Sequence, residues 1–181
     1  MTITTAHGFV ILATIYARFP GKEALFTAVV TQSVAANTAR VETLTPTGAT
    51  IEERLESVAV AVLQRILASD VIGLIRMAIA ESHRFPDLAS SVYAMARERG
   101  AQAVARPLAE AAQFDELGTL PAFAPELLTT TTRFFQDVVI FPLLFRALFG
   151  ENLEQLSAQI NPHVTRSVAF FLAACRHGGV N

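Results

Sequence analysis

The chain has 181 residues, of which 52% are hydrophobic and 17% are charged. This length fits one domain, or one domain with a small extension, and the high apolar content excludes a disordered chain. The formal net charge of −2 excludes a nucleic-acid binder that relies on overall positive charge, so any affinity for DNA would have to be local. The low charged fraction also indicates that a second subunit covers part of the apolar surface.

Hydrophobic spacing predicts helices almost throughout, and no hairpin signal is present. The first helix is expected from about residue 21 to residue 44, and the segment 45–48 separates it from the next. That second helix begins at a capping box, in which the Thr50 hydroxyl accepts from the Glu53 amide and the Glu53 side chain reaches back. The apolar residues behind the box recur at spacings of three and four and form one stripe: Ile51, Leu55, Val58, Val62 and Ile66.

A third helix is predicted from about residue 69 to residue 84. Proline suits the first turn of a helix, so Pro86 is expected to open a fourth helix that runs to about residue 105. Gly100 and Pro107 are the positions at which this helix would break or kink. The following segment, 114–125, contains one glycine and two prolines and is predicted to be a long loop.

The next helix is predicted over residues 125–149, and Gly150 is its expected left-handed stop. Pro142 lies inside this helix and has no N–H to donate to the Val138 carbonyl, so a kink is expected there. The last helix is expected to open with Asn161 as its cap and Pro162 in its first position. One face of it is apolar and carries Val164, Val168, Phe171, Leu172 and Cys175. The whole chain is therefore predicted to be all-α, with about seven helices.

The most specific stretch covers residues 13–26 and reads ATIYARFPGKEALF. It closely resembles the end of the helix-turn-helix in TetR-family transcriptional regulators, where a recognition helix ends in Thr-apolar-Tyr-x-x-Phe and Lys-Glu-x-Leu opens the next helix. More weakly, residues 75–88, with Arg76, Glu81, Arg84 and Leu88, resemble the regulatory domain of the AefR-like branch of that family.

The resemblance implies a TetR-like fold with two parts. Residues 1–44 would be the remnant of a helix-turn-helix DNA-binding head, comprising the recognition helix and the connecting helix. Residues 45–181 would bind ligand and dimerise, with the C-terminal helices of two subunits forming a four-helix bundle. The implied function is a repressor whose affinity for a double-stranded DNA operator is tuned by a small apolar effector. A cytoplasmic location is expected separately, from the lack of a membrane-length apolar run and of a signal-sequence pattern.

The family pattern places four residues on DNA. Small and hydroxyl side chains near the start of a recognition helix reach base edges, and neighbouring hydroxyls and cations hold phosphates. By this pattern Thr14 and Tyr16 would face DNA, Arg18 could add a phosphate contact, and Lys22 would meet a phosphate at a helix N-terminus. The alternatives are a half-buried packing tyrosine at Tyr16 and a solvated lysine at Lys22.

The head departs from the family pattern on its N-terminal side. Two helices normally precede the recognition helix, and residues 1–12 are too few to build them. The helix-turn-helix is therefore expected to be incomplete in this chain. Either the chain is a shortened form of a full regulator, or it is a ligand-binding and dimerisation module that has lost DNA binding and acts on a full-length partner.

The sequence contains no motif typical of an enzyme active site or of a metal site. The histidines at positions 7, 83, 163 and 177 are far apart and lack metal-ligand spacing. Cys175 is the single cysteine, which excludes a disulfide framework, and it is expected to be a buried apolar residue. No apolar run approaches the ~18 residues of a membrane span. The sequence thus predicts a non-enzymatic chain without a cofactor or a membrane partner.

Eight of the thirteen phenylalanines follow residue 120, which is more than one subunit would be expected to bury, and a homodimer interface is predicted from them. They are Phe123, Phe134, Phe135, Phe141, Phe145, Phe149, Phe170 and Phe171. The family resemblance further implies an apolar cavity with a few polar groups. Its candidate lining residues are Arg76, Tyr93, Thr131 and Phe135, for which a surface or capping position is the alternative.

Overall fold

The structure, a computed structural model, describes residues 19–113 and 119–177. Every regular element in these two ranges is helical, which confirms the all-α prediction. Those elements, in chain order, are α2 (Lys22–Glu42), α3 (Ile51–Ile66), α4 (Ser69–Glu81), α5 (Pro86–Ala112), the 3₁₀ turn η2 (Pro121–Phe123), α6 (Leu128–Phe135), the π-helical turn η3 (Gln136–Ile140), α7 (Phe141–Leu148) and α8 (Leu153–Arg176).

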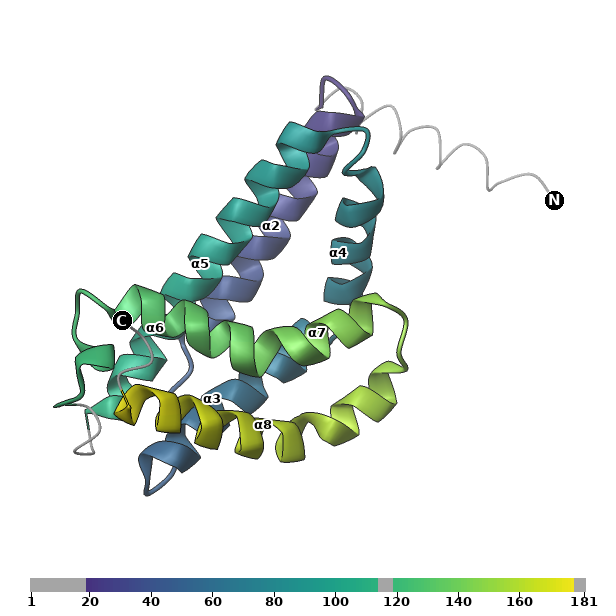
Figure 1. Ribbon diagram of the computed structural model, residues 1–181. Coiled ribbons are helices and arrows are strands. Elements are labelled where there is room, and N and C mark those ends of the chain that lie inside the picture. Colours follow the sequence, from purple (N-terminus) through teal and green to yellow (C-terminus); the bar gives the residue numbers. More distant parts are fainter. Residues whose placement is uncertain (1–18, 114–118, 178–181) are drawn as a thin grey trace.

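The two long helices α2 and α5 lie side by side, and α4 stands beside them (Figure 1). The last helices, α7 and α8, lie together with α3 across one end of the group formed by α2, α4 and α5. Arg106 of α5 fixes the end of α2, because its guanidinium donates to the carbonyl oxygens of Glu42, at 3.0 Å from Nε, and of Leu44, at 3.2 Å. The C-terminal end of α2 is thereby held against α5.

Helix α3 is the centre of the core. Its apolar stripe is buried as predicted, apart from Ile66, which is half-buried. The predicted capping box is present, with the Glu53 amide donating to the Thr50 hydroxyl at 3.2 Å. On its other side α3 packs antiparallel to α8, and Arg176 of α8 pairs with Glu52 at 3.2 Å. Sequence spacing alone was sufficient to define this helix.

Helix α5 is unbroken at both of the positions at which a break or a kink was expected. It runs from Pro86 to Ala112, with Pro107 in its interior. An interior proline costs about 3 kcal/mol in a helix that nothing else supports. Here Val104 and Leu108 are almost wholly buried on either side of Pro107, so their packing holds the segment helical.

The expectation that the last helix opens at Asn161 and Pro162 is wrong. Helix α8 begins at Leu153 and is capped by Asn152, whose Oδ1 accepts from the amides of Glu154 at 2.9 Å and Gln155 at 3.0 Å. Pro162 therefore lies in the helix interior. The cap and the buried residues of the first two turns, Leu156 and Ile160, supply the stabilisation that lets the helix continue through the proline.

The expected single helix with a kink at Pro142 is divided into three pieces. Between α6 and α7 the chain makes the π-helical turn η3, in which the amide of Phe141 donates to the Gln136 carbonyl five residues earlier. Pro142 has no N–H, so the regular ladder of hydrogen bonds is interrupted there and the backbone accommodates an extra residue. The segment ends at Gly150, whose φ of 99° confirms the predicted left-handed stop.

Half of the late phenylalanines are packed within this chain. The ring of Phe171 lies 5.2 Å from that of Phe135, 6.1 Å from that of Phe134 and 6.4 Å from that of Phe123, measured between centroids. Exposed fractions of 54%, 85% and 65% remain at Phe145, Phe149 and Phe170. Any interface between subunits would therefore draw on this second group.

Cys175 is buried at the end of α8, as predicted. Loss of hydration in the core raises the pKa of its thiol to about 11. The thiol is therefore protonated near neutral pH, and a protonated thiol is a poor nucleophile.

Candidate functional site

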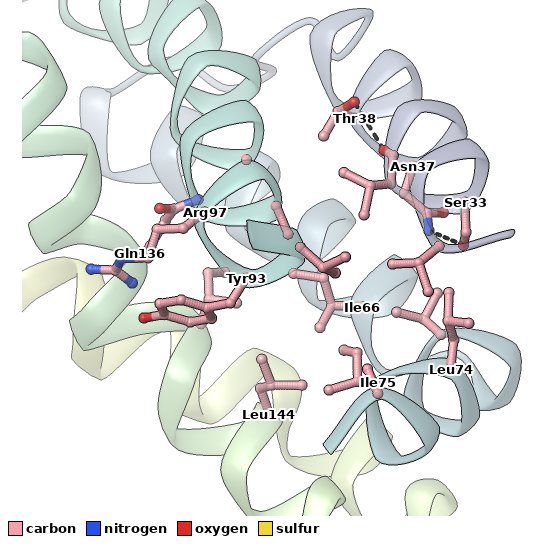
Figure 2. Close-up of a pocket in the computed structure, with 18 of the residues that line it drawn as sticks. Ser33, Asn37, Thr38, Ile66, Leu74, Ile75, Tyr93, Arg97, Gln136 and Leu144 are labelled. Carbon is pink, nitrogen blue, oxygen red and sulfur yellow. Dashed lines mark hydrogen bonds between the residues drawn. The ribbon is translucent and has the colours of Figure 1, made fainter. Parts of the chain in front are cut away.

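A cavity of about 570 Å³ lies between α2, α4, α5 and α7 (Figure 2). Most of its lining side chains are apolar, among them Val34, Ile66, Leu74, Ile75, Val92 and Leu144. The volume falls within the range of roughly 300–1,000 Å³ that is typical of small-molecule sites. The cavity is thus large enough to enclose a small organic ligand.

Two features of the sequence produce this space. Helix α4 turns an apolar stripe toward it, in which Val71, Leu74, Ile75 and Ala78 follow one another at helical spacing. The facing side of α5 carries small residues at Ala89, Ala96, Gly100 and Ala103. These four small side chains fill little of the space between α5 and the stripe on α4, although larger residues of α5, among them Val92 and Tyr93, also line it.

One group of polar residues lies on the α2 side of the cavity and is bonded within the protein. The Asn37 amide oxygen accepts from Arg65 Nε at 2.6 Å, and its nitrogen lies 3.4 Å from the Ser33 hydroxyl. The Thr38 hydroxyl lies 3.0 Å from the Val34 carbonyl of its own helix. Arg65 also pairs with Asp70, at 2.8 Å between Nη2 and Oδ2.

The second polar group lies on the opposite side and comprises Tyr93, Arg97 and Gln136 (Figure 2). Both terminal nitrogens of Arg97 bond to Asp137, at 2.8 and 3.0 Å, and its guanidinium lies 5.1 Å from the centre of the Phe141 ring. The hydrogen bond that Arg97 donates to Asp137 raises the pKa of Arg97, so this residue stays charged. Tyr93 is 61% exposed, which places it at the rim.

The structure brings only one of the four predicted lining residues to the cavity, Tyr93. Arg76 instead donates from Nε to the Leu148 carbonyl at 3.2 Å and from Nη2 to the Ala147 carbonyl, so it caps the end of α7. Thr131 and Phe135 are buried in the core, where the Thr131 hydroxyl donates to the Ala122 carbonyl.

Sequence reasoning missed Asn37, Arg97 and Gln136. A usable signal existed for Arg97, because it follows Tyr93 by one helical turn among small residues that a packed core would not favour. Asn37 and Gln136 gave no such signal. They belong to helices that meet α5 only in the folded chain.

Of the predicted DNA-facing residues, Thr14, Tyr16 and Arg18 lie outside the described residues. Lys22 is the exposed first residue of α2. The cavity is lined farther along the same helix, from Val30 to Val41. At 1.5 Å per residue, Asn37 lies roughly 22 Å along the helix axis from Lys22. Helix α2 therefore connects the segment that precedes it directly with the cavity.

Other chemistry has little support in the part of the chain that the structure describes. No group of three or more His, Cys, Asp or Glu side chains there could hold a metal ion. Within the same ranges no single helix is long and apolar enough to cross a membrane, although α3 and α4, bent by 64° where they meet, pass that test as a pair.

Residues 53–176 match the family described as the AefR-like transcriptional repressor, C-terminal domain. Among solved structures, the fold is similar to that of a chain from Mesorhizobium loti MAFF303099 described as a TetR-family transcriptional regulator. The TM-score is 0.71 at 21% identity, and the match covers 90% of this chain and 79% of that one. No curated protein gave a significant match to the sequence.

Proposed function

Because this chain belongs to the TetR family of transcriptional regulators through its AefR-like C-terminal domain, we propose that it binds operator DNA as a repressor under the control of a small apolar effector. The cavity between α2, α4, α5 and α7 is the observation that carries the proposal. Its size and apolar lining suit a small molecule, and regulators of this family act by binding rather than by turnover.

The proposed control runs through α2. The effector contacts the half of this helix that lines the cavity, and the DNA-contacting residues lie at or before its first turn. An effector that fits one position of α2 better than another shifts the population toward that position by its difference in affinity. In the proposed division, residues 1–44 bind DNA and residues 45–181 bind ligand. Helix α2, which would couple the two activities, then belongs to the DNA-binding part and packs against the ligand-binding part.

The proposed DNA contacts are those of the family pattern. Thr14 reaches base edges, Tyr16 and Arg18 approach phosphates, and Lys22 meets a phosphate at the N-terminus of α2. The exposure of Lys22 supports its part, because a phosphate contact needs an accessible cation. Gly21, just before it, provides no side-chain cap, so the first amides of the helix have no such partner there.

The test is a pulldown of fragmented genomic DNA with the full chain at low and at moderate salt. We expect enrichment of one or a few palindromic sites, with an affinity that falls steeply as salt rises. Lys22→Ala should reduce the slope of log affinity against log salt by about one, whereas Arg166→Ala, an exposed cation on α8, should leave it unchanged.

An unchanged slope in Lys22→Ala removes that residue from the DNA contact. Absence of any enriched fragment at either salt concentration contradicts operator binding altogether. In that case the alternative function applies, a ligand-binding and dimerisation module that acts on a full-length partner.

A further inference from the structure

We propose that the effector is an electrically neutral molecule whose apolar body fills the cavity and whose hydrogen-bonding group meets Tyr93 and Gln136. This inference rests on the proposed function, since it names the class of ligand that the cavity would take. It follows from the charges and the hydrogen bonds of the lining residues.

The charges that line the cavity are already balanced. Among its described lining residues the ionisable groups that carry charge at neutral pH are Arg65 and Arg97. Each of them bonds through both terminal nitrogens to one carboxylate outside the lining, Asp70 for Arg65 and Asp137 for Arg97. Two neutral pairs therefore border the cavity.

A charged ligand is disfavoured in either sign. An anion would have to take a guanidinium away from a carboxylate that binds it in the strong two-pronged geometry. A cation would lie near two guanidinium groups and find no carboxylate among the described lining residues. Burial of an unpaired charge is costly, so a neutral molecule is the class that this lining accommodates.

The position of the polar group follows from which hydrogen-bonding atoms are free. The groups on α2 are engaged with one another, with Arg65 or with their own helix. Within the described ranges, no hydrogen bond joins the Tyr93 hydroxyl or the side-chain amide of Gln136 to another residue. A Cβ added to Gly100 would lie 3.3 Å from Gln136 Nε2, so the missing side chain at Gly100 provides the space in which this amide lies.

The exposed fractions of the lining residues indicate how the ligand is oriented in the cavity. Tyr93 and Phe145 line the cavity and are 61% and 54% exposed, so they lie at the rim. Ile66, Ile75 and Leu144 also line the cavity, are less exposed than the rim residues and offer only apolar surface. The polar group of the ligand would therefore lie at the rim and its apolar body inside.

The test measures binding of three probes with the same chain length by calorimetry at pH 7: decanol, decanoate and decylammonium. Decanol should bind about tenfold or more tightly than either ion. Tyr93→Phe and Gln136→Leu should each weaken decanol binding by about three- to tenfold. Gln102→Leu, a matched change on an exposed part of α5 outside the lining, should have no effect.

A second variant pair separates charge balance from shape. Asp137→Asn leaves Arg97 without its anion and should raise decanoate affinity about tenfold with little change for decanol. Glu98→Gln removes a carboxylate that pairs with Arg133 away from the cavity, and it should change neither value. Stronger binding of either ion than of decanol to the unmodified chain overturns the inference, as does a failure of all three probes to bind.

The two proposals fail separately. Probe binding is measured without DNA, so loss of operator binding leaves the calorimetric result unaffected. If decanol binds as expected and does not change the enrichment of DNA fragments, the cavity has the proposed selectivity and the proposed regulation is contradicted.

Discussion

Gly73 lies on an exposed part of α4, and nothing lies within 4 Å of the position that a Cβ would take there. Glycine in a helix interior is less favourable than alanine because it loses more backbone freedom on folding. We expect Gly73→Ala to raise the free energy of unfolding by about 0.5–1 kcal/mol, measured by urea denaturation.

Gly48 provides a control at which the same substitution should change the free energy of unfolding in the opposite direction. Its φ is 134°, and a Cβ there would collide with the Cβ of Glu53. Gly48→Ala should therefore lower the free energy of unfolding. A loss of stability in Gly73→Ala would show that the exposed part of α4 is covered by something outside this chain.

The identity of a residue was a better guide to whether it is buried than to whether it lines the cavity. Tyr93, Arg76 and Thr131 are all amphipathic or polar residues next to apolar ones, and each could have lined a cavity. Only Tyr93 does so. Arg76 reaches the end of α7 and Thr131 reaches Ala122, and both partners are set by contacts between elements.

At the scale of the element, helix α8 could start at Leu153 or at Pro162. Two asparagines, one before each of these residues, distinguish the two starts. Asn152 caps the helix, while Asn161 is exposed in its interior. Asn152→Ala should lower the free energy of unfolding by about 1 kcal/mol, because two amides at the helix start lose their acceptor.

Asn161→Ala is the matched control. It removes the same side chain from a helix interior, where alanine is the better helix former, and should be neutral or slightly stabilising. Urea denaturation of the two variants side by side measures the difference. A larger loss in Asn161→Ala would support the shorter helix that begins at Pro162.

Proline illustrates what an element-level rule can miss. The rule that proline opens or bends a helix holds at Pro86 and at the π-helical turn before Pro142. At Pro107 and Pro162 proline neither opens nor ends a helix, because α5 and α8 continue through them. At these two positions the buried residues elsewhere on the same helix compensate for the lost hydrogen bond.

For the whole molecule, the exposed phenylalanines still support the predicted homodimer. Phe149 and Phe170 lie on or next to the last two helices and are largely exposed. Exposed aromatic side chains on neighbouring elements are a frequent component of subunit interfaces. We expect the chain to be a dimer at micromolar concentration.

Phe170→Ser should raise the dimer dissociation constant by about tenfold or more, because an aromatic anchor would be lost from the interface. Sedimentation equilibrium measures this value. Met77→Ser, which changes an exposed apolar residue on α4, should not alter it. A monomeric unmodified chain at micromolar concentration would contradict the prediction.

The sequence by itself determined the helical class, the family and most helix positions. These properties depend on local patterns: the apolar stripe and capping box of α3, the stop at Gly150 and the stretch from residue 13 to residue 26. Each can be read from residues a few positions apart, because a helix repeats every 3.6 residues.

Only the tertiary structure decided which residues line the cavity and which charges are neutralised there. Asn37, Arg97 and Gln136 are far apart in the chain and share one space because α2 packs on α5 and the ion pair of Arg97 with Asp137 holds η3 beside α5. Contacts between elements likewise set Asp137 against Arg97, and the packing of α8 on α3 helps to carry α8 through Pro162. Contacts between elements decide these features, and their energies are absent from any local window of the sequence.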